Sequence, residues 1–176
     1  MLERERKALS QARLEHAIEC LSAARNLLET ENYKSAANRS YYAVFHAMRA
    51  VLAFDEIDMK RHSGVISEFR RRYIKTEIFE TRMSEIISVL FDVRTDSDYD
   101  DFFVISKADT AVQIENAEYF VSSVRAYLKI RNGKRYNGTG ITESQCRFPS
   151  LKENEQVYDT LTCVHTPVLT VLNTVI

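Results

Sequence analysis

Two residues that could act together on a phosphate group stand seven positions apart, Arg39 and His46. On an α-helix, seven residues fall only about 20° short of two full turns, so both side chains project in nearly one direction, roughly 10 Å apart along the axis. Histidine can exchange a proton near neutral pH, and arginine offers a charged, planar fork to phosphate oxygens. Such a pair could cleave an RNA phosphodiester by acid–base chemistry that requires no metal ion.

The helical wheel extends this polar face. It places Asn38, Tyr42 and Arg49 beside the pair. The opposite side is apolar and consists of Ala37, Tyr41, Val44, Phe45, Met48, Val51 and Leu52. A third strip of small residues would let another helix approach closely, within the bundle or at a dimer seam: Ala36, Ala43, Ala47 and Ala50. The alternative is that Arg39 is an ordinary surface charge and His46 a half-buried helix residue.

A second candidate binding surface is basic. Between positions 60 and 75 the chain carries Lys60, Arg61, Arg70, Arg71, Arg72 and Lys75. Glu68 is the only acid in this interval, and the aromatic residues Phe69 and Tyr73 lie within it. Phosphate-backbone binding, with little sequence preference, would use Arg70 and Arg71, whereas a solvated helix face is the alternative. His62 is either a second site residue or part of a helix cap.

Composition limits the other possibilities. A chain of 176 residues with 45% hydrophobic content suits one domain with an appendage, and its net charge of −1 argues against wholesale electrostatic capture of nucleic acid. Cys20, Cys146 and Cys163 form no CxxC pair, so neither a disulfide framework nor a zinc site is indicated, and no cofactor is expected. His16 is expected at a core or boundary position. The charged start and the lack of a membrane-length apolar run predict a soluble, cytoplasmic protein without membrane contact.

Apolar periodicity predicts an all-α fold, an antiparallel up-and-down bundle of about five helices. The expected ranges are 4–29, 33–54, 62–74, 78–95 and 107–130, the last opened by a capping box at Ser106 and Asp109. In the first helix the expected buried residues are Leu9, Ala12, Ala17, Cys20, Ala24, Leu27 and Leu28. Gly64 is the only glycine before position 130, so the domain is expected over 1–130. The region 131–176 is expected to be an irregular tail, either disordered or with short β segments.

Three segments together resemble the HEPN domain family over about residues 5–130. They are AANRSYYAVFHA at 36–47, KRHSGVI at 60–66, and Arg94 followed by Asp98-Tyr99-Asp100. The resemblance implies a helical bundle that forms a homodimer, with the Arg-x4–6-His motifs of both subunits meeting in a shared cleft. In catalytic members this motif makes a metal-independent ribonuclease, often the toxin of a toxin–antitoxin pair whose partner is a minimal nucleotidyltransferase.

Carried onto this sequence, the resemblance makes Arg39 the residue that stabilises the scissile phosphate and His46 the acid or base. Asn38 and Ser40 would orient them. Met48 stands where relatives silenced by nucleotide attachment often carry tyrosine, so that form of control is not expected. Two other functions remain open: a non-catalytic module that binds a nucleotide or a nucleotidyltransferase partner, and a helical scaffold that dimerises through the alanine strip.

Overall fold

The structure, a computed structural model, describes residues 2–133 of the chain. This part contains no strand and consists of five α-helices and one π-helical turn: α1 (Glu3–Glu29), α2 (Tyr33–Phe54), α3 (His62–Phe69), η1 (Arg70–Ile74), α4 (Arg82–Tyr99) and α5 (Lys107–Gly133). The prediction of an all-α bundle of about five helices is confirmed. The predicted tail lies almost wholly outside the described residues, so the division at position 130 stays a prediction.

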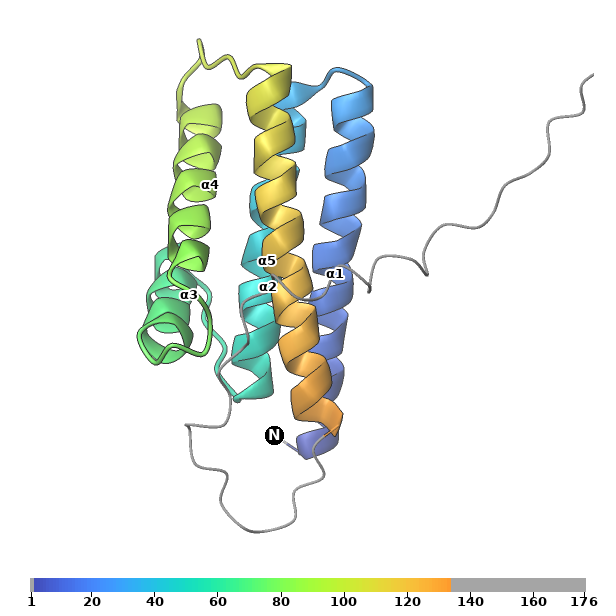
Figure 1. Ribbon diagram of the computed structural model, residues 1–176, viewed down its shortest axis with the longest axis vertical. Coiled ribbons are helices and arrows are strands. Elements are labelled where there is room, and N and C mark those ends of the chain that lie inside the picture. The colour runs from blue at the N-terminus through green and yellow to red at the C-terminus, as the bar shows by residue number, and fades with distance from the viewer. Residues whose placement is uncertain (1, 134–176) are drawn as a thin grey trace, which may run out of the picture.

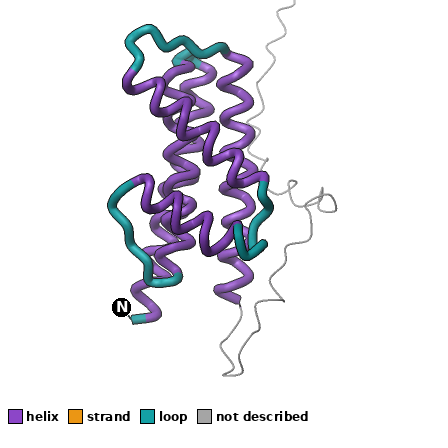
Figure 2. The backbone as a smooth tube through the Cα atoms, turned by 90° about the vertical axis from the view of Figure 1, so that its left-hand side faces the viewer, coloured by secondary structure: helices purple, strands orange, loops and turns teal. Residues whose placement is uncertain are grey.

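The three longest helices, α1, α2 and α5, run side by side, and α4 lies along the same bundle with α3 near its end (Figure 1). Short connections join successive helices, as the side view shows (Figure 2). No helix among residues 2–133 combines the length and apolarity needed to cross a bilayer.

Helix α2 is the centre of the bundle, because it packs against α1, α3, α4 and α5. Between Ala36 and Phe54 every residue is buried except five: Asn38, Arg39, Tyr42, His46 and Arg49. The predicted polar stripe therefore contains all the residues that this part of α2 leaves accessible to solvent.

The alanine strip of α2 is a packing surface inside one chain. Ala36, Ala43, Ala47 and Ala50 have no exposed surface. Small side chains let α1 approach closely enough for Ser10 Oγ to donate a 2.8 Å hydrogen bond to the carbonyl of Ala50. The packing role is confirmed, whereas the expectation of a dimer seam is wrong, because these residues have no surface left to offer a second copy.

Two helices differ in detail from the sequence-based expectation. In α1, Ala12 is exposed, while Leu14 and Leu21 are buried, so the apolar face is rotated from the predicted one. Helix α4 begins at Arg82 and not at position 78, since residues 75–79 form a turn in which Glu77 has a φ of 58°. It also continues through its acidic end instead of becoming a loop at position 95, and there Arg94 and Asp98 form an i,i+4 ion pair at 2.7 Å.

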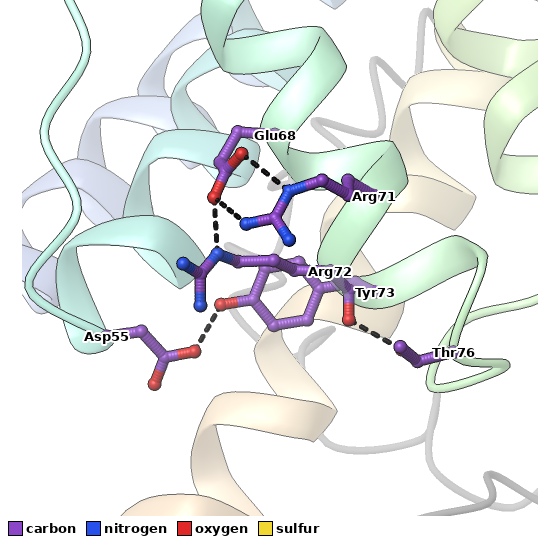
Figure 3. Close-up of polar contacts among 6 residues, drawn as sticks. All are labelled: Asp55, Glu68, Arg71, Arg72, Tyr73 and Thr76. Carbon is purple, nitrogen blue, oxygen red and sulfur yellow. Dashed lines mark hydrogen bonds and ion pairs between the residues drawn. The ribbon is translucent and has the colours of Figure 1, made fainter.

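Side-chain bonds fix the ends of the helices. The predicted cap of α5 is present, since Ser106 Oγ accepts a hydrogen bond from the backbone N–H of Asp109 at 3.0 Å. At the other end of the bundle, Tyr73 of η1 donates to Asp55, which follows α2 (Figure 3). Arg131 of α5 donates to the same carboxylate at 2.8 Å. This contact ties η1, α2 and α5 together below the open stripe.

The alanine packing can be tested by enlarging one residue. Ala43→Leu should lower the free energy of unfolding by about 1–3 kcal/mol, because added methylenes must displace α1 from α2. Ala12→Leu places the same side chain on the exposed side of α1 and should change stability by less than about 0.5 kcal/mol. Urea unfolding measures both; equal stability of the two variants would contradict the close packing.

Candidate active site

The structure places Arg39 and His46 on one face of α2. Arg39 is exposed and His46 is half-buried. None of the ion pairs within residues 2–133 includes Arg39, so its guanidinium has no carboxylate to compete with an incoming anion. The two groups therefore lie on a surface that a ligand can reach.

Tyr42 lies between the two groups. The guanidinium carbon of Arg39 is 5.0 Å from the centre of the Tyr42 ring, which is a cation–π distance. The Tyr42 and His46 rings are stacked with centroids 6.3 Å apart. Helix α2 thus presents a guanidinium, a phenol ring and an imidazole in a row. The ring of Tyr42 separates the guanidinium from the imidazole, the two groups that could act on a phosphate.

One border of the stripe is formed by α1 and the loop after α2. Asp58 Oδ1 accepts hydrogen bonds from Arg49 at 3.1 Å and from Arg13 at 2.8 Å. Arg13 also donates to the backbone carbonyl of Arg49 at 3.3 Å. Arg49 is therefore held in place beside the pair, with its charge partly balanced by Asp58.

The other border is formed by α4. Asn38 Nδ2 donates to Asp98 Oδ1 at 3.2 Å, and the other oxygen of Asp98 pairs with Arg94 at 2.7 Å. Asn38 is thus oriented from α4 and not by the residues of its own helix.

His62 joins the site from the first turn of α3. Its ring stacks on Phe45 at 4.1 Å and lies 6.1 Å from Tyr42, so the Phe45–Tyr42 pair separates the imidazoles of His62 and His46. Tyr41 hydroxyl and His62 Nδ1 are 2.6 Å apart. Burial raises the pKa of Tyr41, so the hydroxyl keeps its proton while it shares this hydrogen bond with His62. Burial, with Arg94 and Arg49, lowers the pKa of His62.

The electrostatic surroundings of His46 favour its neutral form. Burial lowers the pKa of His46 to about 4, and His16, Arg49, Arg13 and Arg39 add to this effect. Near pH 7 the ring is an uncharged acceptor. A bound phosphate would bring negative charge next to the ring and raise its pKa again.

A possible metal-binding group lies on the α1 side of His46. Ligand atoms of His16, Cys20 and His46 all lie within 4.8 Å of one another, and the rings of His16 and His46 meet edge to face with centroids 4.2 Å apart. The expectation that the chain has no zinc site rested on the spacing of cysteines along the sequence. The fold instead brings His16 and Cys20 of α1 next to His46 of α2.

Ser40 does not lie on the stripe. It has no exposed surface, and its hydroxyl donates to the carbonyl of Ala36 at 3.1 Å within the same helix. The structure therefore does not bring it to the place where Arg39 and His46 would meet a substrate.

The basic segment is less free than its sequence suggests. Arg71 donates two hydrogen bonds to Glu68, which Arg72 also binds (Figure 3), and these bonds lower the pKa of Glu68 to about 2. Phe69 and Tyr73, the aromatic residues of this segment, are buried and offer no surface to a ligand. Both side chains pack into the core, because α3 and η1 contribute their apolar sides to it.

A groove of about 550 Å³ nevertheless lies between α3, η1 and α4, and Arg71 lines it. Arg70, which also lines it, donates to the carbonyl of Ser84 at 3.0 Å and to Ser88 Oγ at 2.6 Å. Ser63, next to His62 in the chain, lines the same groove.

Sequence reasoning missed what α1 contributes. Arg13, His16 and Cys20 follow one another at i, i+3 and i+7, which places them on one side of a helix. A helical wheel of α1 that tracked nitrogen and sulfur groups would have found this second face.

Comparison with known proteins finds one family and several similar chains. The family model described as the HEPN domain matches residues 10–128. Two similar proteins come from Methanocaldococcus jannaschii. "Putative toxin MJ0142" is 32% identical over 68% of this chain and 81% of its own length, and "Putative toxin MJ0605" is 34% identical over 68% and 88%. A "UPF0332 protein" of Thermotoga maritima is 30% identical over 64% of this chain and 86% of its own.

The environment of His46 predicts its titration. In the folded chain, with chelator present, the His46 ring should titrate with a midpoint near pH 4, against about 6.5 when unfolded. The unfolded chain then binds more protons between these values, so the ring's contribution to stability is present above about pH 6.5 and is lost as the pH falls toward 4. NMR of the imidazole signals, assigned with His46→Gln, measures this. A folded-state midpoint of 6.5 or above would contradict the burial and the repulsion described here.

Proposed function

Because the chain belongs to the HEPN domain family, we propose that it is an endoribonuclease in which Arg39 and His46 cleave RNA without a metal ion. One observation carries this proposal: α2 is buried on every side except a stripe that holds these two residues. If Arg39 and His46 had only a structural role, they would not need to lie on the one solvent-accessible face of the central helix.

The chemistry assigns one role to each group. His46, neutral near pH 7, accepts the proton of a ribose 2′-hydroxyl as that oxygen attacks the adjacent phosphorus. The bond from phosphorus to the 5′-oxygen breaks, a 2′,3′-cyclic phosphate forms, and the leaving oxygen takes up a proton from water. His46 then releases the ribose proton to solvent and is ready for another cycle. Arg39 donates to the phosphate oxygens as their negative charge grows. The same phosphate raises the pKa of His46, so binding itself makes the ring a better base.

The neighbouring side chains would bind the RNA strand. Tyr42 offers a ring for a base to stack on, with His62 beside it, and Asn38 is fixed by Asp98 as a polar contact. Arg49 lies over the neighbouring Phe45 ring. Arg70 and Arg71, which line the groove between α3, η1 and α4, would bind the phosphate backbone. Contacts of this kind give affinity that falls with salt and little sequence preference.

We propose that the active form is a homodimer with a composite site. The ring of Tyr42 separates Arg39 from His46 within one chain, at 5.0 Å and 6.3 Å, which hinders both groups from reaching one phosphate. In a two-fold dimer the stripes of two chains face each other, so Arg39 of one subunit can meet His46 of the other.

The relatives named as toxins support a toxin–antitoxin role, with a minimal nucleotidyltransferase as the proposed antitoxin. Met48 has no exposed surface and no hydroxyl, so this position offers no acceptor for an attached nucleotide. An antitoxin would therefore act on this chain by another route, such as covering the stripe.

One observation favours the alternative, a non-catalytic module that binds a nucleotide or a nucleotidyltransferase partner. The low pKa of His46, about 4, makes the free ring a weak base. The same neutral ring and the cations around it would still bind a phosphate.

Cleavage assays separate the two functions. With chelator present, Arg39→Ala and His46→Ala should each lower the rate of RNA cleavage by at least about 100-fold, since one loses phosphate stabilisation and the other the base. Arg125→Ala removes an exposed arginine from α5 and is the matched control, expected to cleave at the parent rate. Equal rates in all four proteins would remove the catalytic proposal; retained RNA binding without cleavage in the parent would support the binding module.

Mixing two inactive variants tests the composite site. Arg39→Ala and His46→Ala subunits, unfolded together and refolded, should recover about a quarter of the parent activity, because half of random dimers are mixed and one of their two sites is intact. Refolding each variant alone is the control and should give no recovery. No recovery in the mixture, with mixed dimers detected by mass, would show that each chain acts by itself.

A further inference from the structure

Helices α1 and α2 bring together three side chains that bind transition metals. His16 and Cys20 are one turn apart on α1, so they project from the same side of that helix, and His46 faces them from α2. Their ligand atoms lie within 4.8 Å of one another. The cluster comes from two elements that the core already fixes, which is how a rigid metal site is built.

The donor set suits Zn²⁺, which takes imidazole nitrogen and thiolate sulfur in a tetrahedral arrangement. Bonds of about 2.0 Å to nitrogen and 2.3 Å to sulfur place ligand atoms roughly 3.3 to 3.7 Å apart, so the side chains must close by about 1 Å. The side chain of His16 is 53% exposed and can make this movement. Three protein ligands leave a fourth position for water.

Glu19 supplies a supporting contact. Its Oε2 lies 3.2 Å from His16 Nδ1, so this nitrogen has a carboxylate partner and Nε2 is available to a metal ion. Carboxylates commonly hold metal-binding imidazoles in this way, because the hydrogen bond fixes the orientation of the ring and makes the other nitrogen a better donor.

We propose that His16, Cys20 and His46 bind a Zn²⁺ ion and that this binding inhibits the protein. The inhibition rests on the proposed ribonuclease function, whereas the binding does not. Zinc would occupy the lone pair of His46 that must accept the ribose proton. On binding, the Cys20 thiol loses its proton to solvent and the thiolate balances one of the two metal charges.

The cations near the three ligands, and the burial of Cys20, lower the affinity of the site for zinc. Arg13, Arg39 and Arg49 all act electrostatically on His46 and would repel a dication. Burial also raises the pKa of the Cys20 thiol, so forming the thiolate costs free energy. The site should therefore release zinc more readily than a closed structural site, as a regulatory site requires.

Cobalt is the probe for binding, since tetrahedral Co²⁺ absorbs visible light and its bond to a thiolate adds a charge-transfer band. The full chain, freed of metal, should bind one Co²⁺ with both features, and Zn²⁺ should displace it. The double variant Cys146→Ser with Cys163→Ser should keep the thiolate band, whereas Cys20→Ala should lose it. His62→Ala is the matched histidine control and should bind as the parent does, while His16→Ala should bind at least tenfold more weakly.

Two results would overturn the site: no thiolate band in the parent, or a band that survives Cys20→Ala. His16→Ala keeps the test valid if Cys20→Ala fails to fold, because His16 lies at the surface.

Inhibition is measured separately: Zn²⁺ should slow RNA cleavage by the parent, and at least tenfold more Zn²⁺ should be needed for His16→Ala, each relative to its own metal-free rate. Equal zinc sensitivity would overturn the inhibition alone, and a parent that binds Co²⁺ but cuts no RNA would overturn only the proposed function.

Discussion

The burial of α2 against four other helices is the constraint on which the rest of the structure depends. A helix surrounded in this way can expose hydrogen-bonding groups to a ligand only where no neighbour packs, and here that is one stripe. The alanine strip makes the packing possible by admitting α1 closely. The side chains of the stripe are therefore positioned by the core, and a substrate would meet a surface that is already in place.

This surface is cationic although the whole chain carries a net charge of −1. Three arginines from α1 and α2, namely Arg13, Arg39 and Arg49, act on His46, and Asp58 holds two of them in position. Arg94 of α4, paired with Asp98, adds a fourth cation beside Asn38 and His62. These cations attract phosphate and, together with burial, keep the imidazole of His46 uncharged until an anion arrives.

The sequence predicted the helices and the stripe well because both follow from the 3.6-residue period, which any amphipathic helix must show. It could not give the partners of these residues. The Asn38–Asp98 bond, the Tyr41–His62 bond and the meeting of His16 with His46 join different helices, and their relative rotation depends on packing. Ala12 and Ser40 show the same limit, since alanine and serine are neutral on a wheel and only neighbouring helices decide whether they are covered.

Binding of an uncleavable RNA tests the central claim most directly, that the stripe of α2 receives a phosphate beside His46. A 2′-O-methyl oligoribonucleotide lacks the attacking hydroxyl, so the complex persists while the imidazole signals are followed by NMR. The account predicts that the His46 signal shifts on binding and that its pKa rises from about 4 toward neutrality, as a neighbouring phosphate requires. Bound RNA that leaves both the His46 signal and its pKa unchanged would contradict the account.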